Sequence, residues 1–351
     1  MKTFNIFTNE KDTLPEGKAD FLLACSVTRT CEIEGITQAG IPTKIPLTPT
    51  LDAEFLINEK VFSLGVLAKT PTGVPSPALI TRASHNLSPF SSLEILDLGL
   101  ETKPQNTPVH NFDIKPSDSI AKGANIKAIE IFSKGMDLGK TYELKGSYLI
   151  LGESTPAGTT TAAASCLALG YFCKNDFSSS FANAPKDIKS ETIRQALALT
   201  NIEMGNFEKL NFVSDNMLLF CAGFLLEASR RFHVVLAGGT QMAAVLLLAD
   251  KLKEDVLMRL QSDNISLSTT AWVVRDENSD IQHLLSRLSY VPHAIYTEFS
   301  FKDAEIDVLK KYDEGEAKEG VGAGAALAYA NKNGHTNKEV LEAIELLMYM
   351  N

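Results

Sequence analysis

The sequence lacks the short motifs of the commonest nucleotide-binding and metal-binding proteins. It contains neither the GxxxxGK[ST] pattern of NTPase phosphate loops nor the GxGxxG pattern of dinucleotide-binding folds. Its five cysteines form no CxxC and its six histidines form no HxxxH, so we expect no metal site and no cofactor. An odd number of cysteines in mostly apolar surroundings predicts reduced, buried thiols, which are typical of the cytoplasm.

A basic surface and a long apolar segment are also missing. The 351 residues include 33 Lys and Arg against 43 Asp and Glu, and the net charge of −10 argues against binding to nucleic acid. The longest apolar run, Met217–Leu226, is too short to cross a bilayer, and Met1–Asp20 is too polar for a signal peptide. We therefore expect a cytoplasmic protein that binds neither nucleic acid nor membranes.

The sequence does contain a glycine loop between a short strand and a helix. Tyr148–Leu151 is apolar as in a buried strand, Gly152–Gly158 reads GESTPAG, and a helix follows with Thr159 or Thr160 as its N-cap. The first amides of a helix lack partners and can bind phosphate, and glycine lets a ligand approach the backbone. Without a ligand, the same residues form a plain strand-to-helix turn, and the loop alone favours neither interpretation.

A second glycine loop lies near the end of the chain. Lys318–Ala330 reads KEGVGAGAALAYA, in which Glu319 precedes three alternating glycines and an alanine-rich helix. Each loop thus places one carboxylate, Glu153 or Glu319, beside a turn that enters a helix. If both turns border one crevice, two helix N-termini and two carboxylates would surround the same ligand.

Short apolar strands alternate with helices along the whole chain. This pattern predicts an α/β fold with a mostly parallel, doubly wound (Rossmann-like) sheet covered on both faces. We expect one large domain over residues 1–351, in which residues 300–351 contribute a small helical lobe. The expected strands are Ala19–Ser26, Leu93–Leu98, Tyr148–Leu151, His233–Leu236 and Thr270–Val274. The main expected helices are Lys127–Lys140, Thr159–Leu169, Ser190–Leu199, Asp215–Arg230, Met242–Lys253, Ile281–Leu288, Phe301–Tyr312 and Thr336–Met350, with Gly35–Asp52 as an extended loop.

These motifs, in this order, resemble a divergent branch of the nicotinate-nucleotide:dimethylbenzimidazole phosphoribosyltransferases. The segments that carry the resemblance are Ala19–Ser26, Leu93–Glu101, Gly152–Thr161, Asp215–Thr240 and Glu319–Leu327. The resemblance implies transfer of 5-phosphoribose from nicotinate mononucleotide to a benzimidazole-type base, which gives an α-riboside 5′-phosphate for the lower ligand of cobamides. It also implies small-molecule substrates and a homodimer.

The resemblance assigns roles to individual residues. Glu319 matches the general base, with Glu316 as its rival, and Glu153 matches the glutamate that opens the phosphate loop. Lys189 matches a phosphate-contacting lysine, with Lys186 as the weaker candidate. The other residues expected to hold the nucleotide are Gly152, Ser154, Thr155, Gly158, Thr159, Thr160, Gly320, Gly322 and Gly324. Ser26, Thr28, Gly239 and Thr240 are expected to line the pocket.

The sequence departs from the family in two places that bear on function. Ser154–Thr160 replaces the usual Gly-Met-Asn/Gly-Asn-Thr-Thr loop, and Ser26–Thr30 stands where the family has an acidic–histidine–glycine motif. Two other functions therefore stay open at this point: a nucleotide-binding protein without catalysis, and a hydrolase that sends water to the same sugar carbon.

Overall fold

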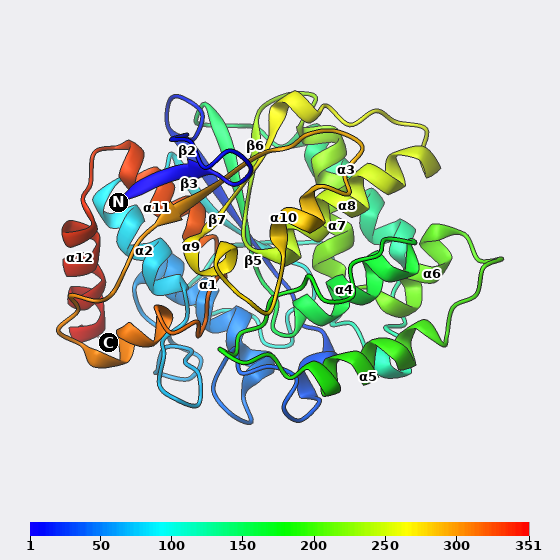
Figure 1. Cartoon of the computed structure of the whole chain (residues 1–351), viewed down its shortest axis with the longest axis horizontal. Coiled ribbons are helices and arrows are strands. Elements are labelled where there is room, and N and C mark those ends of the chain that lie inside the picture. The colour runs from blue at the N-terminus through cyan, green and yellow to red at the C-terminus, as the bar shows by residue number, and fades with distance from the viewer. Residues whose placement is uncertain (351) are drawn as a thin grey trace.

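The computed structural model describes residues 1–350 and shows a three-layer α/β architecture (Figure 1). Eight strands form one sheet in the order β1-β8-β7-β6-β5-β2-β3-β4, and only β1 runs antiparallel to its neighbour. The strands are β1 Lys2–Asn5, β2 Ala19–Cys25, β3 Ser92–Asp97, β4 Val109–Asn111, β5 Tyr148–Ser154, β6 Val234–Ala237, β7 Ile265–Thr270 and β8 His293–Glu298. The mostly parallel, doubly wound sheet expected from the sequence is confirmed.

Helices cover both faces of this sheet because its central strands are apolar on both sides. Phe21 and Leu23 of β2 pack with one set of helices, whereas Leu22 and Ala24 face the other set. The first face is covered by α1 Thr48–Asn58, α2 Ala78–Leu87, α11 Ala323–Lys332 and α12 Asn337–Tyr349. The second face is covered mainly by α3 Ala128–Thr141, α4 Gly158–Ala168, α7 Asn216–Ala228, α8 Thr240–Asp255 and α10 Ile281–Leu285. The remaining helices are α5 Lys186–Leu197, α6 Asn206–Val213 and the short α9 Ala271–Val274.

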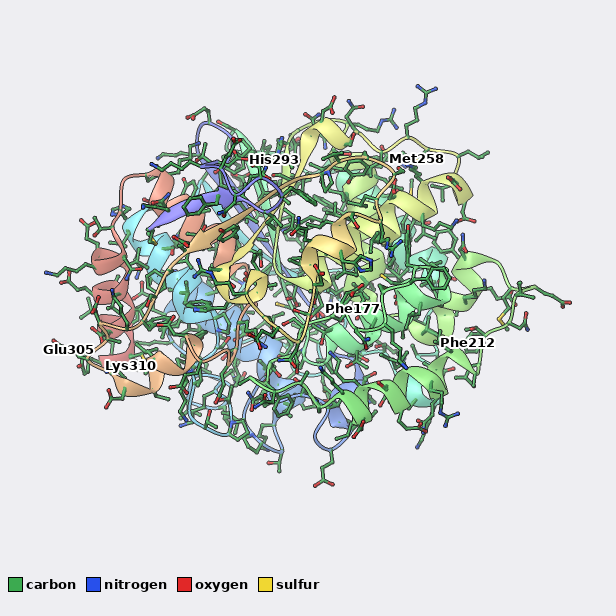
Figure 2. All side chains as sticks on the ribbon, in the orientation of Figure 1. Phe177, Phe212, Met258, His293, Glu305 and Lys310 are labelled. Carbon is green, nitrogen blue, oxygen red and sulfur yellow. The ribbon has the colours of Figure 1, made fainter. Side chains whose placement is uncertain are left out.

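Side chains fill the space between these layers. Figure 2 shows them on both sides of the sheet. Phe177 belongs to the apolar core between the sheet and the helices of the second face. All five cysteines are buried and free, as the sequence predicts. Within residues 1–350, no helix combines the length and the apolar character that crossing a membrane requires.

The order of the strands sets the position of the site. From β2 the chain winds outward through β3 and β4, and from β5 it winds the opposite way through β6, β7 and β8. The connections therefore change direction between β2 and β5, and open α/β sheets bind ligands at the carboxyl ends of such neighbouring strands. The loop that follows β5 begins at this point.

Several predicted element boundaries are wrong. Thr270–Val274 is not a strand: β7 ends at Thr270, whose side chain caps the helical turn α9. The serines and threonines of ISLSTT hid this strand, because the sequence is polar although all six residues are buried; Ser266 contacts His233 Nε2 at 3.0 Å. β8 and the edge strands β1 and β4 were not predicted.

The helix starts also differ from the predictions. α1 begins at Thr48, with a proline in its first turn, inside the segment expected to be extended. α5 begins at Lys186 after Pro185, so Ser190 lies inside the helix and does not cap it. In Phe301–Tyr312 only Asp307–Tyr312 is helical, because the Glu345 carboxylate accepts hydrogen bonds from the amides of residues 305 and 306.

Candidate active site

The first glycine segment is partly a strand: the predicted loop from Gly152 is wrong over Gly152–Ser154, because β5 continues to Ser154. These last residues of β5 contact the second glycine loop. The amide of Val321 donates a hydrogen bond of 2.8 Å to the carbonyl of Glu153. A Cβ atom on Gly152 would lie 3.2 Å from the amide nitrogen of Gly322, and one on Gly322 would lie 2.8 Å from the ring of Phe21. The glycines therefore let the two loops approach each other, and this contact brings Glu153 and Glu319 to one place.

Glu153 and Glu319 line the same cavity, which encloses about 930 Å³ including its open mouth. Its walls come from both glycine loops, the starts of α1 and α8, and three loops at residues 36–40, 68–77 and 178–180. The polar lining residues are Thr37, Thr48, Asp52, Lys69, Thr70, Ser76, Glu153, Ser154, Thr155, Thr159, Ser178, Ser179, Ser180, Thr240, Gln241, Lys318 and Glu319.

The carboxylate of Glu319 is held by its own loop. Its Oε1 accepts hydrogen bonds from the amides of Gly320 and Gly324 at 3.2 and 3.1 Å, and its Oε2 accepts one from Thr269 at 3.3 Å. Burial raises its pKa to about 7, although these hydrogen bonds act in the opposite direction. Near neutral pH, Glu319 can therefore both take up and release a proton.

Glu153 has fewer donors and a higher pKa. The side-chain amide of Gln241 donates to its Oε2 at 3.0 Å. Burial, followed by the nearby charges of Glu319 and Asp215, raises the pKa of Glu153 to about 8. The charge of Glu319 therefore helps to keep Glu153 protonated.

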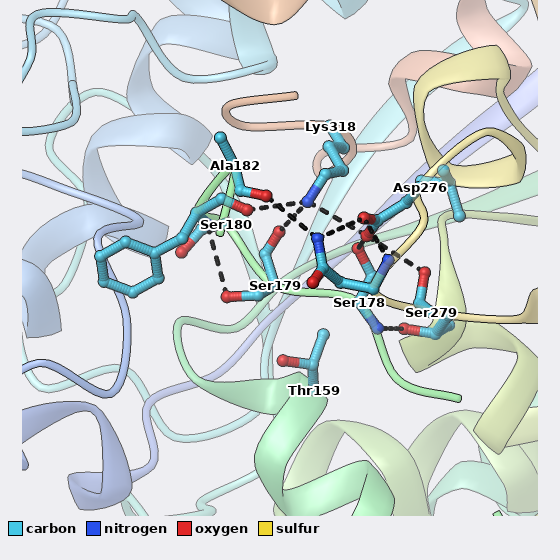
Figure 3. Close-up of polar contacts among 12 residues, drawn as sticks. Thr159, Ser178, Ser179, Ser180, Ala182, Asp276, Ser279 and Lys318 are labelled. Carbon is cyan, nitrogen blue, oxygen red and sulfur yellow. Dashed lines mark hydrogen bonds and ion pairs between the residues drawn. The ribbon is translucent and has the colours of Figure 1, made fainter. Parts of the chain in front are cut away.

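Two buried lysines, Lys189 and Lys318, hold a serine-rich loop against the cavity, and Figure 3 shows the contacts of Lys318. Lys189 Nζ donates to the carbonyl of Ser178 at 2.8 Å and to Thr159 Oγ1 at 3.2 Å. Lys318 Nζ donates to the carbonyls of Ser179 and Phe181 and forms an ion pair of 3.1 Å with Asp276.

Lys189 has no carboxylate beside it among the described residues. Burial, followed by the charge of Lys318, lowers its pKa to about 8. The hydroxyl groups of Thr155 and Thr159 and the serine loop line the cavity at this end, and Thr155 Oγ1 is buried without a partner within residues 1–350. Hydroxyl groups backed by an unpaired ammonium group suit an anion such as phosphate.

The cavity contains about half of the residues predicted for the site. Those that line it are Glu153, Ser154, Thr155, Thr159, Gly239, Thr240, Glu319 and Gly320. Lys189 lies behind Thr159 and does not line the cavity itself. Gly158 leaves room for Gln241, since a Cβ atom there would lie 2.2 Å from its Nε2, and Gly324 packs on the backbone of Thr269.

The structure places the remaining predicted residues away from the cavity wall. Ser26 is fully buried and donates to the carbonyl of Leu98, and Thr28 is fully buried and donates to Thr30. The helix cap expected at Thr159 or Thr160 is wrong, because α4 begins at Gly158 after Ala157, which has a φ of 65°. The Thr160 amide donates to the carbonyl of Ala157.

The two rival residues have other contacts. Glu316 accepts a hydrogen bond of 2.5 Å from Thr72 and does not line the cavity. Lys186 is exposed. Among the cavity-lining residues, Glu319 thus has the position expected of the base, and Glu316 does not.

Sequence reasoning missed Asp52, Ser76, Gln241, Lys318 and Ser178–Ser180. The sequence offers a signal for only some of these residues. Ser178–Ser180 form a run of three serines, and Lys318 stands next to Glu319. Asp52 and Ser76 reach the cavity from α1 and from the loop before α2, so only the tertiary structure identifies them.

Comparison with solved structures defines the class of fold. A nicotinate-nucleotide-dimethylbenzimidazole phosphoribosyltransferase from Thermus thermophilus aligns over 95% of this chain and 84% of its own, with a TM-score of 0.59 and 16% identity. A second structure from the same organism, titled CobT, gives a TM-score of 0.58 at 18% identity, over 95% and 85% of the two chains. The chain has the fold of these phosphoribosyltransferases, which confirms the predicted resemblance.

The chain belongs to the UPF0284 protein family. It is 35% identical over 344 residues to a UPF0284 protein of Sulfurisphaera tokodaii, covering 97% of this chain and 96% of the relative. It is 36% identical over 331 residues to one of Methanocaldococcus jannaschii, covering 91% and 92% of the two chains. The sequence matches no protein-family model.

Proposed function

We propose that the protein transfers 5-phosphoribose from nicotinate mononucleotide to a benzimidazole-type base and releases nicotinate. The observation that carries this proposal is the placement of two carboxyl groups with raised pKa values in one cavity, with an anion-binding end beside them. The 5′-phosphate would bind to Thr155, Thr159 and the serine loop, backed by Lys189. We also propose that the enzyme acts in the cytoplasm as a homodimer, as the family resemblance implies.

The anion-binding wall fixes the ribose. A sugar phosphate held at one end has lost most of its freedom of motion, so its anomeric carbon stays close to the two glutamates. The amides of Gly320, Val321 and Gly324 already donate to Glu319 and Glu153. We therefore assign the phosphate to the wall of hydroxyl groups and the second glycine loop to positioning the carboxyl groups.

The chemistry follows from the two carboxyl groups. One nitrogen of the acceptor attacks the anomeric carbon and forms the new C–N bond, while the bond to nicotinate breaks and nicotinate leaves with its electron pair. The acceptor ring becomes cationic, so its remaining N–H becomes acidic, and Glu319 takes this proton. A pKa of about 7 suits this task, because about half of the Glu319 side chains are ionised at neutral pH and the carboxylate is basic enough to accept the proton.

We assign Glu153 to the developing positive charge on the sugar. With a pKa of about 8, its carboxyl group is mostly protonated at neutral pH in the free protein. Positive charge at the anomeric carbon would lower that pKa and favour the carboxylate, which in turn stabilises the cationic transition state. Gln241 orients the group through its hydrogen bond.

The decisive experiment tests the reaction and the base together. The protein is incubated with nicotinate mononucleotide and a panel of aromatic bases, and the mass of the product is measured. We expect a riboside phosphate and free nicotinate. Glu319→Gln should lower kcat by roughly 10²- to 10⁴-fold and change the Kd for nicotinate mononucleotide little, because its amide oxygen can still accept from Gly320 and Gly324.

Glu316→Gln is the matched control, since Glu316 belongs to the same segment and lies outside the cavity wall. It should retain the rate of the unmodified protein. Three results would contradict the proposal: no riboside phosphate with any base, nicotinate release that is independent of the base, or an equal loss of rate in both variants. The second of these would indicate hydrolysis.

A further inference from the structure

One carboxyl group in the cavity has no role in the mechanism above. Asp52 lies in the second turn of α1, is 2% exposed, and lines the cavity. Its Oδ2 accepts a hydrogen bond of 2.7 Å from Ser154, the residue after Glu153. Its Oδ1 has no hydrogen-bond partner within residues 1–350. A buried carboxylate oxygen without a partner is costly, so its retention at a cavity wall calls for an explanation.

The cavity that Asp52 lines also has an apolar part. Its apolar wall residues include Ile36, Ala39, Ala68, Val74, Pro75 and Pro77, while the Ser76 and Ser154 side chains lie close enough to Asp52 to act against the rise of its pKa. Such a wall suits a flat aromatic ring, and it offers little to a phosphate group or a sugar. The burial that raises the pKa of Asp52 to about 6 still leaves it mostly ionised at pH 7 to 8. Its free oxygen is then an acceptor of hydrogen bonds and repels anions.

We propose that Asp52 selects the acceptor base by accepting a hydrogen bond from an N–H group on the ring. The inference rests on the proposed transferase function. The attacking ring nitrogen and the N–H that Glu319 deprotonates lie on one edge of the base. A second N–H, from an amino substituent or another ring nitrogen, would bind Asp52 Oδ1. The favoured acceptors are thus flat aromatic N-heterocycles with an additional donor, in preference to acceptors that carry only methyl groups.

The test uses acceptors that differ only in this donor. 5-Aminobenzimidazole and 5-methylbenzimidazole have the same shape, and the 4-substituted pair covers the neighbouring direction. For the better-placed pair, we expect the amino compound to have a kcat/KM roughly tenfold to a hundredfold higher than the methyl compound, as for a hydrogen bond to a charged group. Asp52→Leu should abolish or reverse this ratio, because leucine fills the same volume without an acceptor.

Comparing the ratio between variants cancels the intrinsic reactivity of the two bases. Glu54→Gln is the control: Glu54 is a buried carboxylate on the same helix that binds residues 62, 63 and 105 outside the cavity. It should keep the acceptor ratio of the unmodified protein. If Asp52→Leu does not fold, Asp52→Asn gives the same readout, because an amide that accepts from Ser154 directs its NH₂ group into the cavity.

The outcomes separate this inference from the proposed function. Equal use of amino and methyl acceptors would overturn the role of Asp52 and leave the transferase intact. An unchanged ratio in Asp52→Leu would also overturn this role. A rise only in the KM for nicotinate mononucleotide would overturn it as well, and would indicate that Asp52 contacts the sugar. If no base is ribosylated, calorimetric binding of the same bases decides: preferential binding of the amino compound that is lost in Asp52→Leu supports the inference, and equal binding overturns it.

Discussion

At the scale of single residues, three acidic side chains line the cavity. Glu153 and Asp52 are buried and Glu319 is half-buried, and none of the three forms an ion pair with a lysine or arginine in the part of the chain that the structure describes. Neutral donors such as amides and hydroxyl groups stabilise their charges only partly. Burial therefore raises all three pKa values, and the folded protein retains protons that the unfolded chain would release.

This proton retention makes the stability depend on pH. The pKa values of Glu153 and Glu319 rise from 4.5 to about 8 and about 7 on folding. Between pH 4.5 and 8, these two carboxyl groups bind more protons in the folded state than in the unfolded state. They therefore make the free energy of unfolding fall as pH rises. We expect a loss on the order of 1 kcal/mol or more between pH 5 and 8, measured by urea unfolding.

Glu153→Gln should flatten this pH dependence, because glutamine does not titrate and can still accept from Gln241. Glu314→Gln is the control, since Glu314 is an exposed acid. The interpretation is wrong if the stability of the unmodified protein rises between pH 5 and 8, or if Glu314→Gln flattens the curve as much as Glu153→Gln.

At the scale of the elements, α3 and α7 cross with their backbones in contact. A Cβ atom on Gly135 of α3 would lie 2.0 Å from the carbonyl oxygen of Phe220, and one on Gly223 of α7 would lie 2.0 Å from that of Phe132. Both glycines lie inside helices, where glycine weakens a helix by up to about 1 kcal/mol relative to alanine. The close crossing explains why the sequence retains them.

We predict that Gly223→Ala destabilises the protein in spite of the better helix propensity of alanine. The new methyl group must displace backbone, and overpacking of this kind typically costs about 1–3 kcal/mol. Urea unfolding measures the loss. Gly205→Ala is the matched control, because a Cβ atom there has no neighbour within 4 Å. Equal stability of the two variants would show that the helices can move apart freely.

The elements differ in how well the sequence predicts them. β2 and β5 are short apolar runs bounded by turns, and α12 begins with a capping box at Thr336 and Glu339, so local residues suffice. β7 could not be predicted, because four of the six residues in ISLSTT are polar and no local pattern shows that the whole strand is buried. For the site, the two glycine loops and their glutamates were predicted, but Asp52 and Ser76 reach the cavity from elements that carry no local sign of it.

At the scale of the whole molecule, one buried ion pair joins segments that are far apart in the sequence. Lys318 and Asp276 are 3.1 Å apart, with side chains only 3% and 2% exposed. Lys318 belongs to the second glycine loop, and Asp276 follows α9. Asp276 Oδ2 also accepts from Ser178 at 2.9 Å, so the serine loop is tied to both (Figure 3). Burial alone would raise the pKa of Asp276, but Lys318 and these donors hold it below its usual value.

Asp276→Asn should therefore loosen the loop that forms the anion-binding end. Removing one partner of a buried ion pair leaves the other charge uncompensated and costs about 3–5 kcal/mol. We expect a lower free energy of unfolding and faster tryptic cleavage at Lys174, an exposed lysine before the serine loop. The control is Asp307→Asn, which breaks an exposed pair with Lys310 and should lower the free energy of unfolding far less. If both variants lose the same stability and Lys174 is cut no faster, the ion pair does not hold the loop.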